Sequence, residues 1–300
     1  MNNNTILVTG AQGQLGRTLE YYWAVSELPR DNELLFYDIR ELDLTLTNTV
    51  EEELNRINPR TIMNAAAYTS VDQAETEQEA AFLVNASAVA NLADWAARND
   101  CFLVHISTDF VFDGNKLDPY LPEDEVSPLG VYGASKLAGE VALQSRLPDR
   151  HVIIRTSWLY SEYGKNFLTT ILRLIKEKDE IGVVADQVGS PTSTHSLAAL
   201  LLRMRNRETD PGIYHWTDGA SISWYEFALA IQREALEQGL LEREIQIKPL
   251  TTKEYPTAAA RPKYSVLDRS KALGEMEMQA TDWQEELRLV IKKIASKAES

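Results

Sequence analysis

The feature that most constrains the fold is a glycine-rich turn close to the start of the chain. Residues 5–16 read TILVTGAQGQLG, so that Gly10, Gly13 and Gly16 directly follow an apolar strand and open a helix. In a nucleotide-binding unit the first glycine allows the tight turn, the second lets the backbone approach a pyrophosphate, and the third lets the helix lie close to the sheet. N–H groups at the helix N-terminus then bind phosphate. A glycine turn without a ligand is the alternative, and the position in the first strand–helix unit favours a dinucleotide site.

Asp38 lies at the end of the second expected strand, about where a dinucleotide-binding fold places an acidic residue on the ribose hydroxyls. Arg40, two residues later, could instead meet a 2′-phosphate. The two residues therefore leave both NADH and NADPH open as the cofactor.

Apolar strands and amphipathic helices alternate through the first half of the chain. We expect strands at Thr5–Val8, Leu34–Tyr37, Thr61–Met63, Phe102–Ile106 and Val152–Ile154. The helices expected between them are Leu15–Val25, Thr49–Ile57 and Glu79–Arg98. Apolar strands that lack alternation and are joined by helices are typical of a parallel sheet covered on both faces. The prediction is an α/β fold with a Rossmann-type doubly wound parallel sheet.

The second half is less regular and predicts a smaller α+β lobe that binds the substrate. Its expected helices are Asn166–Lys178, Ser196–Arg205, Ser223–Glu237 and Thr281–Ala295, and its expected strands are Ile181–Val184 and Ile245–Ile247. Capping boxes are expected at Thr49 with Glu52, at Ser223 with Glu226 and at Thr281 with Gln284. We assign residues 1–155 mainly to an NAD(P)-binding Rossmann domain, and residues 156–300 mainly to a substrate-binding lobe with excursions back to the main sheet.

Composition and charge exclude several classes of partner. The 45 acidic residues exceed the 30 basic ones, and the formal net charge of -15 opposes binding to nucleic acid or to an anionic membrane. Cys101 is the only cysteine, which rules out an internal disulfide and fits a reducing compartment. Residues 1–5 lack the basic start of a secretory signal, and the four histidines lack metal-ligand spacing. We expect a soluble cytoplasmic protein without a metal.

Small and polar residues follow the third and fourth expected strands. Residues 64–69 read NAAAYT, and their small side chains leave room for a flat ring or a ribose, although close packing explains them equally well. Ser107, Thr108 and Asp109 follow the fourth strand, either as turn and cap residues or as groups that face a ligand. Ligands of open parallel sheets bind at the carboxyl ends of the strands, so the chemistry is expected there.

The segment VYGASK, residues 131–136, places Tyr132 four residues before Lys136. If Tyr132 opens a helix, the two side chains share one face. A nearby ammonium stabilises a phenolate, so the pKa of the tyrosine should fall from about 10 and the phenol should become a competent acid. Of the twelve tyrosines, only Tyr132 has a lysine at this offset, and the pair lies between the fourth and fifth expected strands. Two ordinary surface residues are the alternative, and the position favours proton donation.

Seven segments, in the same order, resemble one family. They read GAQGQLG, NAAAYTSVDQAE, STDFVFDG, VYGASKLAGE, RTSWLY, ADQVGSPT and YPTAAARPKYSVLD. With them the chain resembles the dTDP-4-dehydrorhamnose reductases, which are extended short-chain dehydrogenase/reductases. The resemblance implies a cytoplasmic enzyme, a monomer or a homodimer, that uses NADPH or NADH. It would reduce the C4 carbonyl of dTDP-4-dehydro-beta-L-rhamnose to give dTDP-L-rhamnose, the last step of dTDP-rhamnose biosynthesis.

The resemblance also implies roles for the matching residues. Tyr132 would donate a proton to the C4 carbonyl oxygen, Lys136 would tune Tyr132 and bind ribose, and Thr108 would hydrogen-bond the carbonyl. The cofactor-binding residues would be Tyr132 and Lys136 with Gly10, Gly13, Gln14, Leu15, Gly16, Asp38, Ile39, Asp43, Leu44, Ala65, Ala67, Tyr68 and Thr69. The substrate-binding residues would be Thr108, Asp109, Tyr132, Trp158 and Val71. We add Arg261, whose Arg-Pro context in a loop suits a diphosphate, with a solvated arginine as the alternative.

Two departures from the family pattern have consequences. Phe110 stands where the family commonly has tyrosine, which removes a hydroxyl near the substrate but leaves the proton donor in place. Some members bind a metal through glutamates at a dimer contact, and Thr18 and His195 stand at two such places. We therefore expect no metal and no metal-bridged dimer.

Two other functions stay open. One is a catalytically idle regulatory relative of the methionine adenosyltransferase beta-subunit type, against which the presence of Thr108, Tyr132 and Lys136 counts. The other is a reductase, epimerase or dehydratase of another nucleotide sugar, for which Asp109 leaves room. The YTSVDQAE and RTSW segments weigh against this second alternative.

Overall fold

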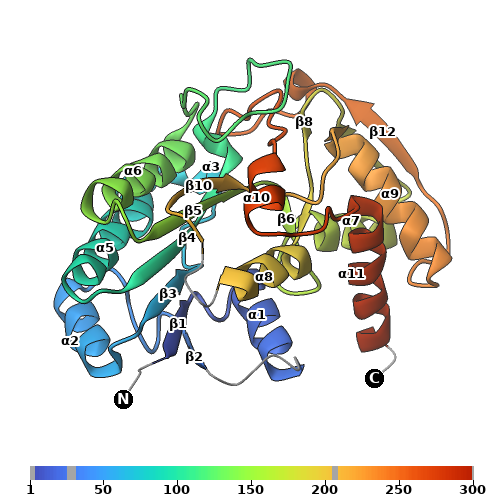
Figure 1. Cartoon of the computed structure of the whole chain (residues 1–300). Coiled ribbons are helices and arrows are strands. Elements are labelled where there is room, and N and C mark those ends of the chain that lie inside the picture. The colour runs from blue at the N-terminus through green and yellow to red at the C-terminus, as the bar shows by residue number, and fades with distance from the viewer. Residues whose placement is uncertain (1–3, 26–31, 205–208, 299–300) are drawn as a thin grey trace.

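The computed structural model describes residues 4–25, 32–204 and 209–298. Its centre is a six-stranded sheet in which every neighbouring pair of strands is parallel (Figure 1). The strands are β1 (Thr5–Thr9), β2 (Glu33–Tyr37), β3 (Thr61–Asn64), β4 (Phe102–Thr108), β5 (His151–Thr156) and β10 (Gly212–His215). Their order across the sheet is β10-β5-β4-β3-β1-β2. The five strands expected in the first half all belong to this sheet, whereas β10 was not predicted.

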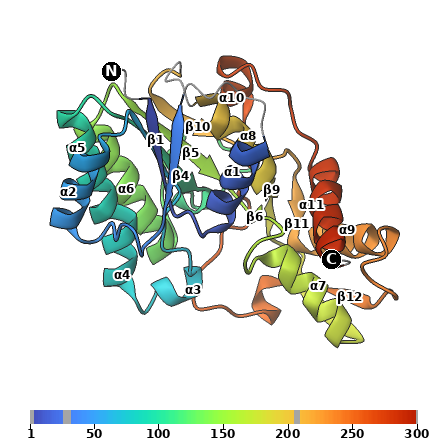
Figure 2. The ribbon, with the colours of Figure 1, turned by 90° about the horizontal axis from the view of Figure 1, so that it is seen from below.

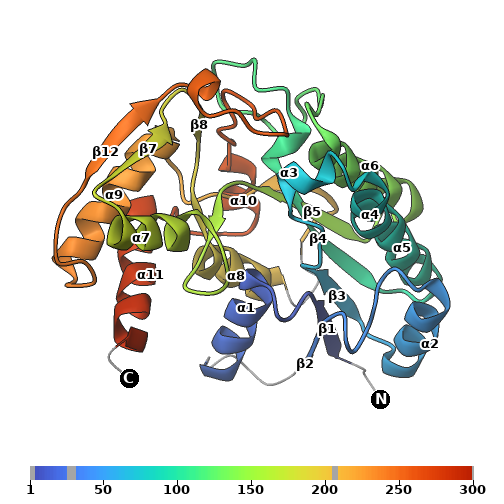
Figure 3. The same ribbon diagram turned by 180° about the vertical axis from the view of Figure 1, so that it is seen from behind.

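Helices cover both faces of the sheet (Figure 2 and Figure 3). One face carries α1 (Gln14–Val25) and α8 (Thr194–Arg203), and the other carries α2 (Thr47–Ile57), α5 (Ala88–Arg98) and α6 (Val131–Arg146). Successive residues of β1 point into different cores, because side chains alternate along a strand. Val8 packs in the same core as Leu19 of α1, and Leu7 packs in the same core as Leu54 of α2. The predicted Rossmann-type doubly wound sheet is confirmed.

The second lobe has a core of its own, built from helices and short strands. Its helices are α7 (Phe167–Glu177), α9 (Trp224–Glu237) and α11 (Trp283–Ala298), and its longest strands, β7 (Glu180–Val184) and β12 (Gln246–Leu250), pair in parallel. The shorter strands form two pairs, β6 (Leu159–Tyr160) with β9 (Thr192–Ser193) and β8 (Val188–Gly189) with β11 (Ile222–Ser223). Phe227 and Ile231 of α9 pack in one apolar core with Leu172 of α7 and Leu287 of α11. α8 and β10 return to the main sheet, and the division at residues 155 and 156 stays a prediction.

The helix expected at Glu79–Arg98 is interrupted. It consists of α4 (Gln78–Phe82), a π-helical turn at Leu83–Ser87 and α5. The other short elements are α3 (Val71–Ala74), the 3-10 turns at Asp109–Val111 and Thr252–Glu254, and α10 (Ser270–Glu275). π-helical turns are often found at functional sites because they displace one residue from the regular hydrogen-bond pattern. Asn85 is the buried residue of this turn, and its contacts are described below.

The capping predictions had mixed outcomes. Ser223 and Glu226 form the expected capping box at the start of α9. The prediction of Thr49 with Glu52 is wrong, because α2 begins at Thr47 and has no side-chain cap. The expected end of α8 at Arg205 lies outside the described residues.

The last helix also begins later than predicted. It starts at Trp283, and the Asp282 carboxylate accepts from the backbone N–H groups of Gln284 and Glu285. Thr281, the predicted cap, instead donates to Asp218 over 3.0 Å. In the described part of the chain, no helix is both long enough and apolar enough to cross a membrane.

Candidate active site

The glycine-rich turn lies where the strand order of the sheet reverses. β2 pairs with one edge of β1 and β3 with the other, and ligands of such folds bind in the crevice at the carboxyl ends of the two diverging units. Gly10 has a φ of +70°, and a Cβ there would lie 2.7 Å from the backbone nitrogen of Ala66. A Cβ on Gly16 would collide with the carbonyl oxygen of Gly10. The turn therefore needs both glycines, and its bare backbone and the start of α1 fit a dinucleotide pyrophosphate.

Asp38 is held beside this turn at the end of β2. Its carboxylate accepts from the backbone N–H groups of Gln12 and Ile39, each over 2.8 Å. The Ile39 side chain is 68% exposed, and Arg40 is exposed next to it. Asp43 accepts from the backbone and hydroxyl of Thr45. The acidic residue expected at the ribose is thus oriented toward the glycine-rich turn.

Three other predicted cofactor residues differ in what they can offer. The side chains of Leu15 and Leu44 are buried in the two cores of the sheet, so only their backbone atoms can meet a ligand. Gln14 begins α1, and its amide oxygen accepts from Ser161 over 3.1 Å and from Asn166 over 2.9 Å. Gln14 therefore ties the phosphate-facing end of α1 to the second lobe.

Asn85 fixes the segment that follows β3. Its side-chain oxygen accepts from the Tyr68 N–H over 2.9 Å, and its amide nitrogen donates to the Tyr68 carbonyl and to the Ser135 hydroxyl. The backbone of the π-helical turn approaches α6 closely, since a Cβ on Gly139 would collide with the Asn85 carbonyl oxygen. Asn85 thus connects the predicted cofactor residues Ala65, Ala67, Tyr68 and Thr69 to the helix that carries Tyr132. The alanine-rich pattern hid this role, because a π-helical turn leaves no distinct sequence signal.

Tyr132 lies in the first turn of α6 beside the end of β4. Glu75 accepts from the Val131 N–H over 2.9 Å and caps the start of this helix. The ring of Tyr132 meets Phe110 edge-on, with 5.6 Å between centroids. Burial raises the pKa of Tyr132 and the nearby Thr108 hydroxyl opposes that rise, so the two side chains are neighbours. Lys136 follows one turn later and is buried.

The expected lowering of the Tyr132 pKa by Lys136 is wrong for this structure. Burial raises the pKa of Tyr132 to about 12, with Asp109 adding to the rise and Thr108 opposing it. The amino group of Lys136 is directed elsewhere, to the Ile106 carbonyl at 2.6 Å and to the His105 ring at 3.3 Å. Tyr132 is accordingly a protonated phenol at neutral pH, which is the form a proton donor requires.

Asp109 is a buried carboxyl next to Thr108. One carboxylate oxygen accepts from the Thr108 hydroxyl over 3.0 Å, and the other lacks a well-formed hydrogen bond, although Ser265 lies near enough to act on it. Burial raises the pKa of Asp109 to about 6, against the lowering effect of the Ser265 and Thr108 hydroxyls. The structure thus places a second weak acid beside the predicted proton donor.

Trp158 has an unusual backbone conformation just after β5. Its φ is 48°, which is rare for a bulky residue and is found where the surroundings enforce it. Its ring stacks on Trp224 with centroids 3.5 Å apart and covers Gly189, where a Cβ would lie 2.6 Å from the indole. Trp158 therefore presents a fixed aromatic surface between the sheet and the second lobe.

Arg261 joins the loop before Pro262 to α3. It forms a two-pronged ion pair with Asp72, at 2.8 and 3.1 Å, and Asp72 also accepts from the Ala259 N–H. The Arg261 pair lowers the pKa of the Asp72 carboxyl below its usual range. Arg261 is thus paired and partly exposed, and the predicted substrate residue Val71 lies beside its partner Asp72.

Comparison with known proteins identifies the family. A model of the RmlD substrate binding domain family matches residues 4–296. The dTDP-4-dehydrorhamnose reductase of Aggregatibacter actinomycetemcomitans is 44% identical over 291 residues, which span 94% of this chain and 97% of that protein. The chain belongs to the dTDP-4-dehydrorhamnose reductase family. The member of this family from Escherichia coli strain K12 is 38% identical and aligns over 93% of this chain and 94% of its own length.

Solved structures of dTDP-4-dehydrorhamnose reductases share the whole fold. The enzyme from Bacillus anthracis strain Ames, in complex with NADP, superposes with a TM-score of 0.89 at 36% identity and covers 96% of this chain and 99% of its own. UDP-glucose 4-epimerase from Thermus thermophilus, in complex with NAD, has a TM-score of 0.76 at 20% identity and covers 98% of this chain and 99% of its own, which shows a common fold alone. The Rossmann sheet and the second lobe therefore occur together in this family.

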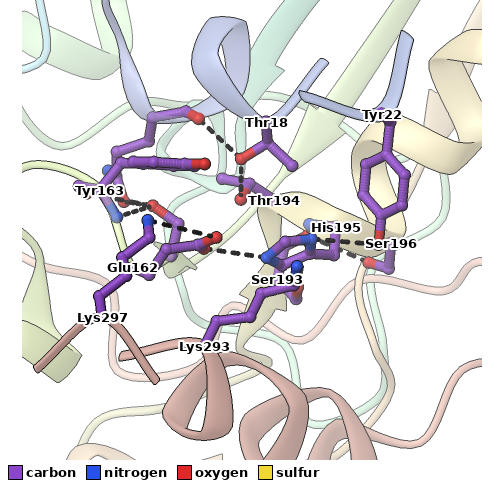
Figure 4. A network of polar contacts seen from close by, with 12 residues as sticks. Thr18, Tyr22, Glu162, Tyr163, Ser193, Thr194, His195, Ser196, Lys293 and Lys297 are labelled. Carbon is purple, nitrogen blue, oxygen red and sulfur yellow. Dashed lines mark hydrogen bonds and ion pairs between the residues drawn. The ribbon is translucent and has the colours of Figure 1, made fainter. Parts of the chain in front are cut away.

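A polar network around Thr18 and His195 joins α1 to the second lobe (Figure 4). Thr18 hydrogen-bonds Thr194 over 2.7 Å. The His195 ring lies between Tyr22 at 3.1 Å and Glu162 at 2.9 Å, and the His195 and Glu162 side chains are buried. Burial acts to raise the pKa of Glu162, but the His195 hydrogen bond lowers it overall. Thr18 and His195 are thus fully engaged in contacts within the chain, and the absence of a metal stays a prediction.

Proposed function

We propose that this protein reduces the C4 carbonyl of dTDP-4-dehydro-beta-L-rhamnose to dTDP-L-rhamnose, as its family membership implies. The observation that carries the proposal is the position of Thr108 and Tyr132 at the carboxyl end of β4, on the same edge of the sheet as the glycine-rich turn. NADPH or NADH, when bound, supplies the hydride to C4. Asp38 and Arg40 favour different cofactors, so either dinucleotide fits the proposal.

Tyr132 acts as the general acid. Its phenol proton passes to the C4 oxygen, which becomes the hydroxyl of the product, and Tyr132 is left as a phenolate. The Thr108 hydroxyl, which already lowers the pKa of Tyr132, stabilises that phenolate and orients the carbonyl oxygen. Lys136, one helical turn away, holds ribose hydroxyls and contributes positive charge when it is protonated.

Residues of the second lobe and of α3 hold the sugar nucleotide. Trp158 offers an aromatic surface to the sugar ring, Asp109 a hydrogen-bonding carboxyl, and Val71 an apolar contact. Arg261 carries the guanidinium fork that matches a diphosphate, and it would exchange Asp72 for the substrate. The proposal includes a cytoplasmic location and a monomer or homodimer, with no nucleic acid or membrane as partner.

The test is oxidation of NADPH or NADH by purified protein in the presence of dTDP-4-dehydro-beta-L-rhamnose, followed by absorbance of the reduced nicotinamide. Tyr132→Phe should lower kcat by about 10²- to 10⁴-fold, because it removes only the donated proton. Cofactor affinity should stay within about twofold in this variant, since most binding contacts lie elsewhere. Tyr225→Phe, which removes a hydroxyl on α9, is the matched control and should retain wild-type kcat.

Three results would count against this proposal. No oxidation with either cofactor would favour the idle regulatory relative. Oxidation with a different nucleotide sugar alone would favour another reductase of the fold. Full turnover by Tyr132→Phe would reject Tyr132 as the acid.

A further inference from the structure

A chain of buried polar side chains runs beneath the carboxyl edge of the sheet, and of its members the proposed proton donation uses Lys136 alone. It joins Thr9 of β1, Asn64 of β3, His105 of β4 and Lys136 of α6, with successive distances of 2.7, 3.0 and 3.3 Å. None of the four residues is more than 2% exposed. Buried polar atoms must find partners of the right sense, so the directions of these hydrogen bonds constrain the protonation of each group.

The Asn64 amide fixes the tautomer of His105. The Asn64 side-chain oxygen accepts from the backbone N–H of Ala66 over 3.3 Å, and a backbone N–H can only donate. The amide nitrogen of Asn64 therefore faces Nδ1 of His105 and donates to it. Burial lowers the pKa of His105 well below its ordinary value, so the ring is neutral whatever the charge of Lys136. A neutral ring that accepts at Nδ1 carries its proton at Nε2.

The His105 Nε2–H then points at the amino group of Lys136. An ammonium has three donors and no lone pair, so two N–H groups would face each other across 3.3 Å. A neutral amine has a lone pair that accepts the His105 proton, and it can still donate to the Ile106 carbonyl. The contact is therefore a hydrogen bond only when Lys136 is uncharged.

The charges around Lys136 do not return its pKa to the ordinary value of a lysine. Burial lowers the pKa of Lys136 to about 8, against a raising effect of Glu140 on the same helix. Arg155 of β5 is paired with that carboxylate at 2.7 Å. From the segment after β4, Asp109 faces Tyr132, and Glu75 is used by the helix N-terminus. Burial and the orientation of His105 thus both lower the stability of the ammonium and increase the share of neutral amine.

We infer that His105 is a positioning residue that increases the share of neutral Lys136 amine until an anion binds at the glycine-rich turn. Binding of the negatively charged dinucleotide then favours the ammonium, and Lys136 takes one proton from solvent. The charge that stabilises the Tyr132 phenolate is therefore acquired with the cofactor. This inference rests on the proposed function of the site.

The test measures protons taken up when NADPH binds in the absence of sugar substrate. Calorimetric titrations in buffers of different ionisation enthalpy give the number of protons per binding event. Near pH 8, wild-type protein should take up about half a proton, because Lys136 is half-protonated at its own pKa and becomes fully protonated when NADPH binds. In His105→Gln the side-chain oxygen can accept from an ammonium, so Lys136 stays charged and uptake should fall below about a quarter of a proton.

His151→Gln is the matched control. His151 is also a buried histidine of the sheet, at the start of β5, and its Nδ1 contacts the Leu147 carbonyl at 2.7 Å. This variant should keep wild-type uptake. Equal uptake by wild type and His105→Gln would overturn the inference and leave the proposed function standing. Failure of both NADPH and NADH to bind the wild type would overturn both.

A second measurement needs no variant of His105. In protein labelled with ¹³C-lysine, the Cε signal of Lys136 can be assigned through its loss in Lys136→Met. This signal should titrate at a lower pH than the Cε signals of the surface lysines. Addition of NADPH should move that titration to higher pH. A Lys136 signal that titrates with the surface lysines in the free protein would overturn the inference, whatever the stability of the variants.

Discussion

Two buried ionisable side chains lie one turn apart on α6, and their surroundings differ. Glu140 is fully paired: it accepts from Nε of Arg155 at 3.0 Å, from Nη2 of Arg155 at 2.7 Å and from the Ser107 hydroxyl. Lys136 donates to one carbonyl and otherwise meets the N–H of His105. A buried ion pair whose hydrogen bonds are all formed holds its side chains in one arrangement. A buried group that faces a neighbour of the same hydrogen-bonding type can instead change its protonation state when a ligand binds.

The same contrast holds for the two buried carboxylates near the site. Glu140 has its charge neutralised by Arg155, while Asp109 is buried without a cation, and burial raises its pKa to about 6. Such groups are costly to the fold, and they concentrate where a site needs weak acids or bases. The comparison implies that the paired cluster contributes stability and that the incompletely paired residues contribute chemistry.

Loss of Arg155 should have the largest effect on stability. Arg155→Met leaves the Glu140 charge buried without a partner and should lower the free energy of unfolding by about 3–5 kcal/mol. Urea unfolding followed by circular dichroism measures the loss. Arg173→Met is the matched control, because Arg173 forms an ion pair of the same 2.7 Å length with Glu177 on the exposed face of α7. The control should cost less than about 1 kcal/mol, and equal losses in the two variants would break the comparison.

Replacing Asp109 should stabilise the protein in a pH-dependent way. The pKa of Asp109 is about 6 in the folded protein and about 3.9 in the unfolded chain. The contribution of the protonated carboxyl to the free energy of unfolding is therefore complete below pH 3.9 and is lost as pH rises through 6. Asp109→Asn does not titrate and should therefore gain about 3 kcal/mol relative to wild type between pH 4 and pH 7. Urea unfolding at several pH values tests this. If the difference in free energy of unfolding between Asp109→Asn and wild type does not change with pH, the pKa of Asp109 is not raised in the folded protein.

The smallest effect on stability is expected at the Asp72–Arg261 ion pair, which joins α3 to the loop before Pro262. The Asp72 and Arg261 side chains are 46% and 24% exposed, and such pairs are largely screened by solvent. Asp72→Asn should change the free energy of unfolding by less than about 1 kcal/mol, as measured by urea unfolding. A loss of unfolding free energy as large as that of Arg155→Met would show instead that the Asp72–Arg261 ion pair holds the two lobes together.

Features encoded by local pattern could be predicted from the sequence. The glycine triplet, the apolar strands and the amphipathic helices predicted the sheet and the place of Gly10, Asp38, Thr108 and Tyr132. These features depend on backbone geometry and on residues close in the sequence, which a single chain displays directly.

Features set by distant partners could not be predicted. His105 directs its N–H at Lys136 because the Asn64 amide of β3 donates to its other ring nitrogen. Arg261 is paired because Asp72, far away in the sequence, lies next to it. The expectation that Lys136 lowers the pKa of Tyr132 failed for the same reason, because burial and the direction of the amine are tertiary properties. β10 was missed because it is short and follows a long excursion through the second lobe.

The edge strand β10 also decides how the protein can be divided. It pairs with β5 from Gly212 opposite Val152 to His215 opposite Arg155, so the last strand of the main sheet comes from the later part of the chain. A fragment cut after residue 155 would leave β5 as an edge strand with unpaired backbone N–H and C=O groups flanked by apolar side chains. Such an edge favours pairing with strands of other chains and hence aggregation. Such fragments should therefore be recovered as aggregates, and exchange of modules between relatives should succeed only if the segment from Gly212 to His215 travels with the nucleotide-binding half.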